Sequence, residues 1–187
     1  MDERRLFRMR SIILFFLCLS SLGFSQEKYW TRSGTLTFEA SIPAFEEVKA
    51  TNENVTAIIN TNNGTFAALA LVKGFRFKNA LMEEHFNESY IESDRFPKAI
   101  FKGQLLDFNV QKLDEKYTLL GSLEMHGKST SISVETYIIK EGNMMKCNGA
   151  FDVNTDDFAI EIPKIVQNKV SNIVTITFDF ELIKKSD

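Results

Sequence analysis

The stretch VSNIVTITFDFELI, residues 170–183, decides the fold class of this 187-residue chain. Apolar side chains occupy every second position from Val174 to Leu182, and Thr, Asp and Glu stand between them. A period of two is the pattern of a strand with one buried and one solvated face. We therefore expect residues 170–183 to form a long strand in an antiparallel sheet.

The same alternation recurs along the chain. Other apolar faces are Leu36-Phe38-Ala40, Tyr117-Leu119-Gly121-Leu123-Met125, Ile132-Val134-Thr136-Ile138 and Met145-Cys147-Gly149-Phe151-Val153. Further strands are expected near residues 54–61, 65–72 and 98–110. Turn-forming residues at 62–64, 73–74, 126–128 and 141–143 imply short loops, and short loops imply antiparallel neighbours.

Seven to nine strands, several of them long, fit a closed barrel or a sandwich, and their length favours the barrel. Thr, Lys, Glu and Ser fill the outer positions, which excludes a membrane barrel with an apolar exterior. Residues 79–90 break the alternation with near-helical spacing and predict one short helix against the barrel. The predicted fold class is therefore all-β.

The first 25 residues have the pattern of a cleaved signal peptide. Four arginines precede the apolar run 12–19, and Gly23 and Ser25 stand at −3 and −1 of a cut before Gln26. The run is too short to span a membrane, so the mature chain is expected to have no transmembrane segment. Residues 26–187 are then expected to form one domain in the periplasm or outside the cell.

Charge and cysteine content limit the partners. Removing four arginines and two acidic residues from the totals of 22 and 25 leaves 18 basic and 23 acidic side chains, a net charge near −5. That balance, without a basic stripe, argues against nucleic acid as a partner. Cys147 alone remains, so an intrachain disulfide is excluded, and stability must come from the core or from a second copy.

We find no catalytic or metal-binding pattern. His85 and His126 are far apart and lack metal-ligand spacing, and we interpret both as surface residues. Cys147 lies on an apolar strand face, which predicts a buried thiol that does not react. The chain is thus expected to be no enzyme, with no cofactor and no metal.

Phenylalanine is unusually frequent, with 17 residues against one Trp and four Tyr. These side chains either fill an aromatic core or form the wall of a hollow barrel that encloses an apolar ligand. Composition alone leaves both alternatives open.

Several segments, in this order, resemble the YceI-like family of exported lipocalin-like proteins. Gly34–Ala40 resembles the first family strand, and His85-Phe86-Asn87-Glu88 followed by Ser93–Phe101 resembles its "H, F, then D-x-[YF]-P-x-[IA]-x-F" segment. Gly121–Lys128 is similar to its "G-x-L-x-x-x-G" hairpin. Residues 157–160 and 170–176 resemble its closing strands.

The resemblance implies an extended, eight-stranded antiparallel lipocalin-like barrel with one or two short helices, often dimeric, in a Gram-negative envelope. It implies no catalysis, and an apolar tunnel that binds polyisoprenoid or other long-chain, fatty-acid-like lipids. The alternative function is an envelope stress or interaction protein with a packed, ligand-free barrel. The expected ligand-binding residues are the apolar lumen positions Phe38, Ile59, Phe66, Phe75, Phe77, Phe86, Phe101, Leu119, Leu123, Val134, Met145, Phe151, Ile162, Val174, Ile176 and Phe178.

Overall fold

The computed structural model describes residues 27–185, which form nine strands. The strands are β1 (Lys28–Ser41), β2 (Lys49–Asn60), β3 (Thr65–Leu71), β4 (Arg76–Phe77), β5 (Lys98–Leu105), β6 (Glu115–Met125), β7 (Lys128–Glu141), β8 (Met144–Asn154) and β9 (Val170–Lys184). The predicted signal peptide lies outside the described residues, and its cleavage stays a prediction. Within the described part of the chain, no helix combines the length and apolarity that crossing a bilayer requires.

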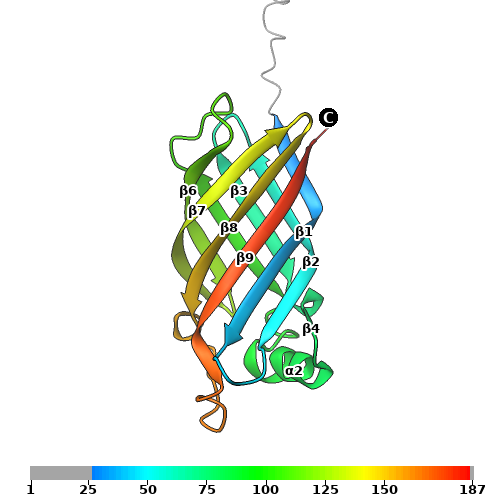
Figure 1. The fold of residues 1–187 in the computed structure, drawn as a ribbon, viewed down its shortest axis with the longest axis vertical. Coiled ribbons are helices and arrows are strands. Elements are labelled where there is room, and N and C mark those ends of the chain that lie inside the picture. Colours follow the sequence, from blue (N-terminus) through cyan, green and yellow to red (C-terminus); the bar gives the residue numbers. More distant parts are fainter. Residues whose placement is uncertain (1–26, 186–187) are drawn as a thin grey trace, which may run out of the picture.

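Eight strands close into an antiparallel barrel in the order β1-β9-β8-β7-β6-β5-β3-β2, and β2 pairs back with β1. The short β4 adds to the end of β2. Figure 1 shows long strands that tilt around the barrel axis, with the helix at the lower end. The predicted all-β, eight-stranded lipocalin-like barrel is confirmed.

The alternating sequence faces point inward as expected. In β9, Ile176, Phe178, Phe180 and Leu182 are buried, while the residues between them are exposed. Two strand ends differ from the prediction. β2 begins at Lys49 because its polar start pairs with β1, and β5 already ends at Leu105.

The helical prediction over 79–90 corresponds to two consecutive elements. Helix α2 covers Ala80–His85, and a π-helical turn, η2, covers Phe86–Tyr90. The Asn79 side chain caps α2 by accepting hydrogen bonds from the Leu81 and Met82 amides. Two short 3₁₀ turns, η1 (Val72–Gly74) and η3 (Thr155–Phe158), lie at the same end of the barrel as α2.

The two ends of the barrel differ. At the end opposite α2, the interior is filled by fully buried side chains, among them Tyr29, Ile59, Leu105, Met145 and Leu182. The loop 106–114 lies next to this filled end, where the Tyr117 hydroxyl donates to the Asn109 and Lys112 carbonyls. We call this the closed end. The α2 end holds the candidate site.

Candidate ligand-binding cavity

The barrel is hollow at its α2 end. A cavity of about 520 Å³ lies there, and its wall is almost wholly apolar. Exposed residues of its lining lie on or beside three segments, the β1–β2 loop, α2 and the loop between η3 and β9, and they mark its opening. A largely apolar cavity of this volume is typical of a small-molecule site.

Four aromatic rings form the wall near the opening. Phe38 of β1 lies 5.2 Å from Phe75, 5.6 Å from Phe77 and 5.1 Å from Phe86 between ring centroids. Phe86 also contacts Phe75 and Phe77 at 6.1 and 5.3 Å. We call Phe38, Phe75, Phe77 and Phe86 the entrance cluster. Its tilted and edge-on contacts fix η2 against β1 and β4.

A second set of rings crosses the deep end of the cavity. Phe66 lies 5.9 Å from Phe101 and 6.2 Å from Phe180, and Phe180 lies 5.3 Å from Phe178. These four rings come from β3, β5 and β9, and all are at most 9% exposed. We call them the floor cluster, because the residues of the closed end begin behind them.

Polar groups gather at the opening. The side chains of Glu46, His85 and Lys169 are exposed there, and Glu46 accepts a hydrogen bond from Asn79. Deeper in the wall, Thr155 is 9% exposed, and its Oγ1 has no hydrogen-bond partner among the described residues. The arrangement separates a polar rim from an apolar interior, which is the division an amphiphile needs.

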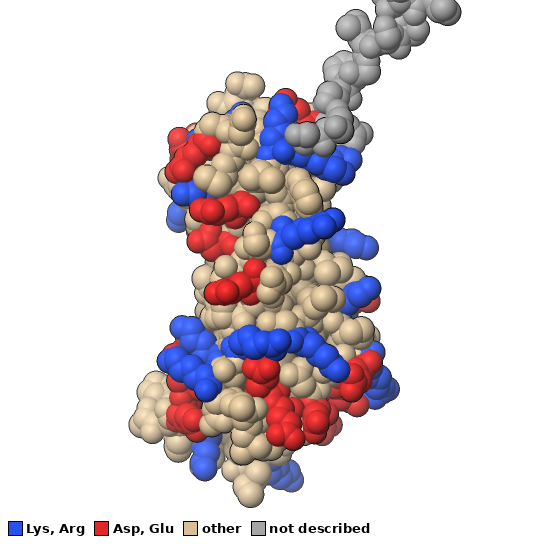
Figure 2. Space-filling model, turned by 90° about the vertical axis from the view of Figure 1, so that its right-hand side faces the viewer, with Lys and Arg blue, Asp and Glu red and all other residues tan. Residues whose placement is uncertain are grey.

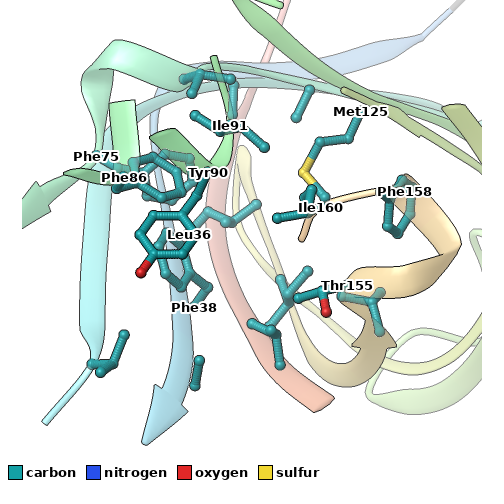
Figure 3. A pocket seen from close by; sticks show the side chains of 18 of the residues that line it. Leu36, Phe38, Phe75, Phe86, Tyr90, Ile91, Met125, Thr155, Phe158 and Ile160 are labelled. Carbon is teal, nitrogen blue, oxygen red and sulfur yellow. The ribbon is translucent and has the colours of Figure 1, made fainter. Parts of the chain in front are cut away.

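Figure 3 shows two walls that face each other across the cavity. Phe38, Phe75, Phe86 and Tyr90 lie on one side, and the opposite side carries Met125, Thr155, Phe158 and Ile160. The second wall is built from the end of β6, from η3, and from Ile160 two residues after η3 ends. Segments distant in sequence therefore meet around this space.

The structure places most of the predicted ligand-binding residues on the cavity wall. These are Phe38, Phe66, Phe75, Phe77, Phe86, Phe101, Leu119, Leu123, Val134, Phe151, Ile162, Val174, Ile176 and Phe178. Ile59 and Met145 also point inward, but they lie fully buried at the closed end and do not line the cavity. Alternation reveals the inward face of a strand and not whether the interior at that level is filled. Ligand contact by the other residues stays a prediction.

Sequence reasoning missed part of the wall. Phe180 belongs to the apolar face of β9 that alternation reveals, so the pattern contained it. Tyr90, Phe158 and Ile160 lie on η2, on η3 and just after η3, where no strand period points inward. Only the packing of these turns against the barrel brings them to the cavity.

The interpretation of His126 as a surface residue is wrong. Its side chain is only 11% exposed, with Nδ1 2.8 Å from the Phe158 carbonyl oxygen and Nε2 3.2 Å from Glu92 Oε2. The ring also meets Phe96 edge-on at 4.5 Å. His126 is thus a structural connection between three segments beside the cavity. His85 is exposed at the opening, as predicted for a surface residue.

Cys147 is fully buried, and burial raises its pKa to about 12, outweighing the hydrogen bond with Thr136. Among residues 27–185, no group of three His, Cys, Asp or Glu side chains is placed to hold a metal ion.

Charged side chains of both signs crowd the α2 end on the face shown in Figure 2, and they are sparser along the barrel wall. Ion pairs there include Lys78 with Glu47 and Arg76 with Glu83. The first joins the β1–β2 loop to the segment before α2, and the second joins β4 to α2. Ion pairs therefore hold together the segments at the rim of the cavity, and the rim carries charges of both signs.

Comparison with known proteins decides the family. The sequence profile of the YceI-like domain matches residues 20–182. The chain belongs to the YceI-like family. No curated protein sequence matches it.

Solved structures of the same fold agree. A polyisoprenoid binding domain from Saccharophagus degradans is 11% identical, covers 86% of this YceI-like chain and 100% of its own, and superimposes with a TM-score of 0.71. BcnA from Burkholderia cenocepacia is 14% identical, with coverage of 81% and 96% and a TM-score of 0.67. The YCEI protein of Campylobacter jejuni is 12% identical, with coverage of 78% and 90% and a TM-score of 0.60. At these identities the likeness shows the fold.

Proposed function

We propose that this YceI-like protein is an exported lipid-binding protein that holds a long-chain amphiphile, polyisoprenoid or fatty-acid-like, in its barrel. The cavity of about 520 Å³ carries this proposal, because its wall is apolar and its rim is polar. Transfer of a hydrocarbon chain into such a space gains roughly 25 cal/mol per Å² of apolar surface removed from water. The polyisoprenoid binding domain of similar fold supports the same ligand class.

The hollow interior argues against the alternative, an interaction protein with a packed barrel. Protein cores are packed to crystal density, and an empty space deprives its wall of dispersion contacts. The Phe-rich wall would regain those contacts with a bound chain. In a packed barrel, side chains would fill the space behind the entrance cluster.

The same geometry supports binding without catalysis. The ionisable side chains on the cavity, Glu46, His85 and Lys169, are exposed at its rim and do not converge inside it. General acid and base chemistry requires such groups within hydrogen-bond reach of a bound reacting atom. The signal-peptide pattern supports a periplasmic or secreted location, in a Gram-negative envelope.

Mass spectrometry of the protein as it is exported tests the proposal. The full chain is produced with its own N-terminal segment, purified without detergent, and measured under native and denaturing conditions. We expect an adduct of several hundred daltons that denaturation releases and organic solvent extracts. A mass without adduct, together with no uptake of an added long-chain fatty acid, would favour the ligand-free alternative. The mature mass also reports whether residues 1–25 are removed.

A further inference from the structure

The cavity is blind. It occupies the α2 half of the barrel, and its deep end is formed by the floor cluster of Phe66, Phe101, Phe178 and Phe180 together with Leu119 and Val134. Behind the floor, the side chains of the closed end are at most 2% exposed, and they do not line the cavity: Tyr29, Ile59, Leu105, Met145 and Leu182. A chain that enters from the rim therefore meets a filled interior.

Glycines of neighbouring strands fix the position of the floor rings. A methyl group at Gly34 of β1 would lie 2.4 Å from the Phe180 ring, and one at Gly149 of β8 would lie 2.7 Å from the Phe178 ring. These distances are far below van der Waals contact, so each ring lies directly against glycine backbone. The aromatic rings of the floor cluster are therefore tightly packed against the backbone of the barrel wall.

The volume limits the ligand. One methylene-sized group takes on the order of 30 Å³, the share of one water in the liquid. The cavity of about 520 Å³ then holds roughly 17 such groups.

The depth of the cavity gives an independent figure for the length of the bound chain. Both Val170 at the rim and Phe180 at the floor lie on β9, ten residues apart. At about 3.3 Å per residue and a tilt of about 40°, they are roughly 25 Å apart along the barrel axis. An extended chain advances about 1.2 Å per bond, the rise of an extended peptide divided over its three bonds, so roughly 21 atoms fit.

The volume and the depth together give the cross-section of the cavity. Volume divided by depth is about 21 Å², which suits one chain whose van der Waals contact distance is about 4 Å. We propose that the floor cluster limits chain length, and that the ligand is a single-chain amphiphile with about 16 to 20 buried carbons. Its headgroup remains at the polar rim. This inference rests on the proposed lipid-binding function and narrows its ligand class.

Saturated fatty acids of 10 to 24 carbons are the probes. Their affinities for the delipidated protein are measured by displacement of a fluorescent fatty acid. Each buried methylene is expected to raise the affinity up to about fourfold, the equivalent of about 0.8 kcal/mol. We expect this rise to stop between 16 and 20 carbons, because further methylenes stay in water.

Two variants should move the limit in opposite directions. Phe180→Leu shortens a floor side chain and should lengthen the preferred chain by a few carbons. Gly34→Ala pushes the Phe180 ring into the cavity and should shorten it. Phe108→Leu is the matched control, since Phe108 packs on Tyr117 beside the closed end and does not line the cavity. Circular dichroism verifies that each variant is folded.

The outcomes separate this inference from the function on which it rests. An affinity that keeps rising to 24 carbons in the native protein would overturn the length limit and leave lipid binding intact. Failure to bind any probe would overturn the proposed function itself. Should either variant fail to fold, the profile of the native protein still decides the question.

Discussion

At the residue scale, His126 shows how a turn residue acquires a tertiary role. His126 and Gly127 have φ values of 49° and 70°, the two positive values of a type I′ hairpin turn. This turn directs the imidazole away from β6 and β7, toward Phe96, Glu92 and the Phe158 carbonyl. Both ring nitrogens lie within hydrogen-bond distance of an acceptor oxygen, so the imidazole connects η3 with the segment before β5.

We predict that His126→Asn lowers the free energy of unfolding by about 1–3 kcal/mol at pH 7 through the lost hydrogen bonds. Asn-Gly is the preferred type I′ pair, so the turn itself survives and the loss reports the tertiary contacts. Urea denaturation followed by circular dichroism measures it. Unchanged stability would show that the three segments hold together without the imidazole.

The same variant should change the acid response. Hydrogen bonds from His126 and then Arg95 lower the pKa of Glu92 below its ordinary 4.5. A lowered carboxyl pKa contributes stability above pH 4.5 that is lost as the pH falls through the folded-state value. In His126→Asn, this part of the loss of stability on acidification should therefore be smaller than in the native protein.

Cys147 gives a second prediction at this scale. Burial raises its pKa to about 12, so almost no thiolate exists at neutral pH, and the thiol lies inside the closed end. Iodoacetamide should leave Cys147 unmodified in the native protein and alkylate it fully in urea. Mass spectrometry of the Cys147 peptide measures both states. Native labelling at the rate of a free thiol would mean that the closed end opens readily.

At the scale of elements, the irregular segments build the rim of the cavity. The segment 91–97 between η2 and β5 packs on the β6–β7 turn, where Phe96 lies over Gly127 and beneath the Arg95 guanidinium. This contact brings the Phe96 ring and the His126-Gly127 turn together. It also holds η2, and with it Phe86, over the opening.

We predict that Phe86→Ala weakens binding of hexadecanoic acid about 5- to 30-fold, the equivalent of about 1–2 kcal/mol of lost apolar contact. Phe86 is half-buried, so the barrel should remain folded. Leu81→Ala is the matched control, because Leu81 is on the same helical segment, 57% exposed and absent from the cavity wall. Equal weakening in both variants would contradict the role of the entrance cluster.

At the scale of the whole molecule, the outer wall has one apolar row. Trp30 of β1 pairs with Ile183 of β9 and with Ile58 of β2, and Ile58 pairs with Ala67 of β3. All four alternate with inward-facing neighbours, so they point outward. Such a row across four strands contrasts with the Thr, Lys and Glu that dominate the rest of the exterior.

The homodimer stays a prediction, and we expect this row to be its contact. Ile58→Lys should then give a monomer in light scattering, with the Trp30 fluorescence shifted to longer wavelength by exposure to water. Thr118→Lys, on the outer face of β6, should leave the dimer unchanged. A native monomer at all concentrations, or a dimer that Ile58→Lys does not affect, would contradict the prediction.

The sequence by itself determined the barrel, because period-two alternation decides which side chains a closed sheet must bury, as β9 shows from Val174 to Leu182. It also placed most of the cavity residues on the inward face. Only the tertiary structure decided where that interior is hollow, and it places Ile59 and Met145 at the filled end. The reason is physical: alternation is local, whereas a cavity depends on ring packing across distant strands, such as Phe66 against Phe180.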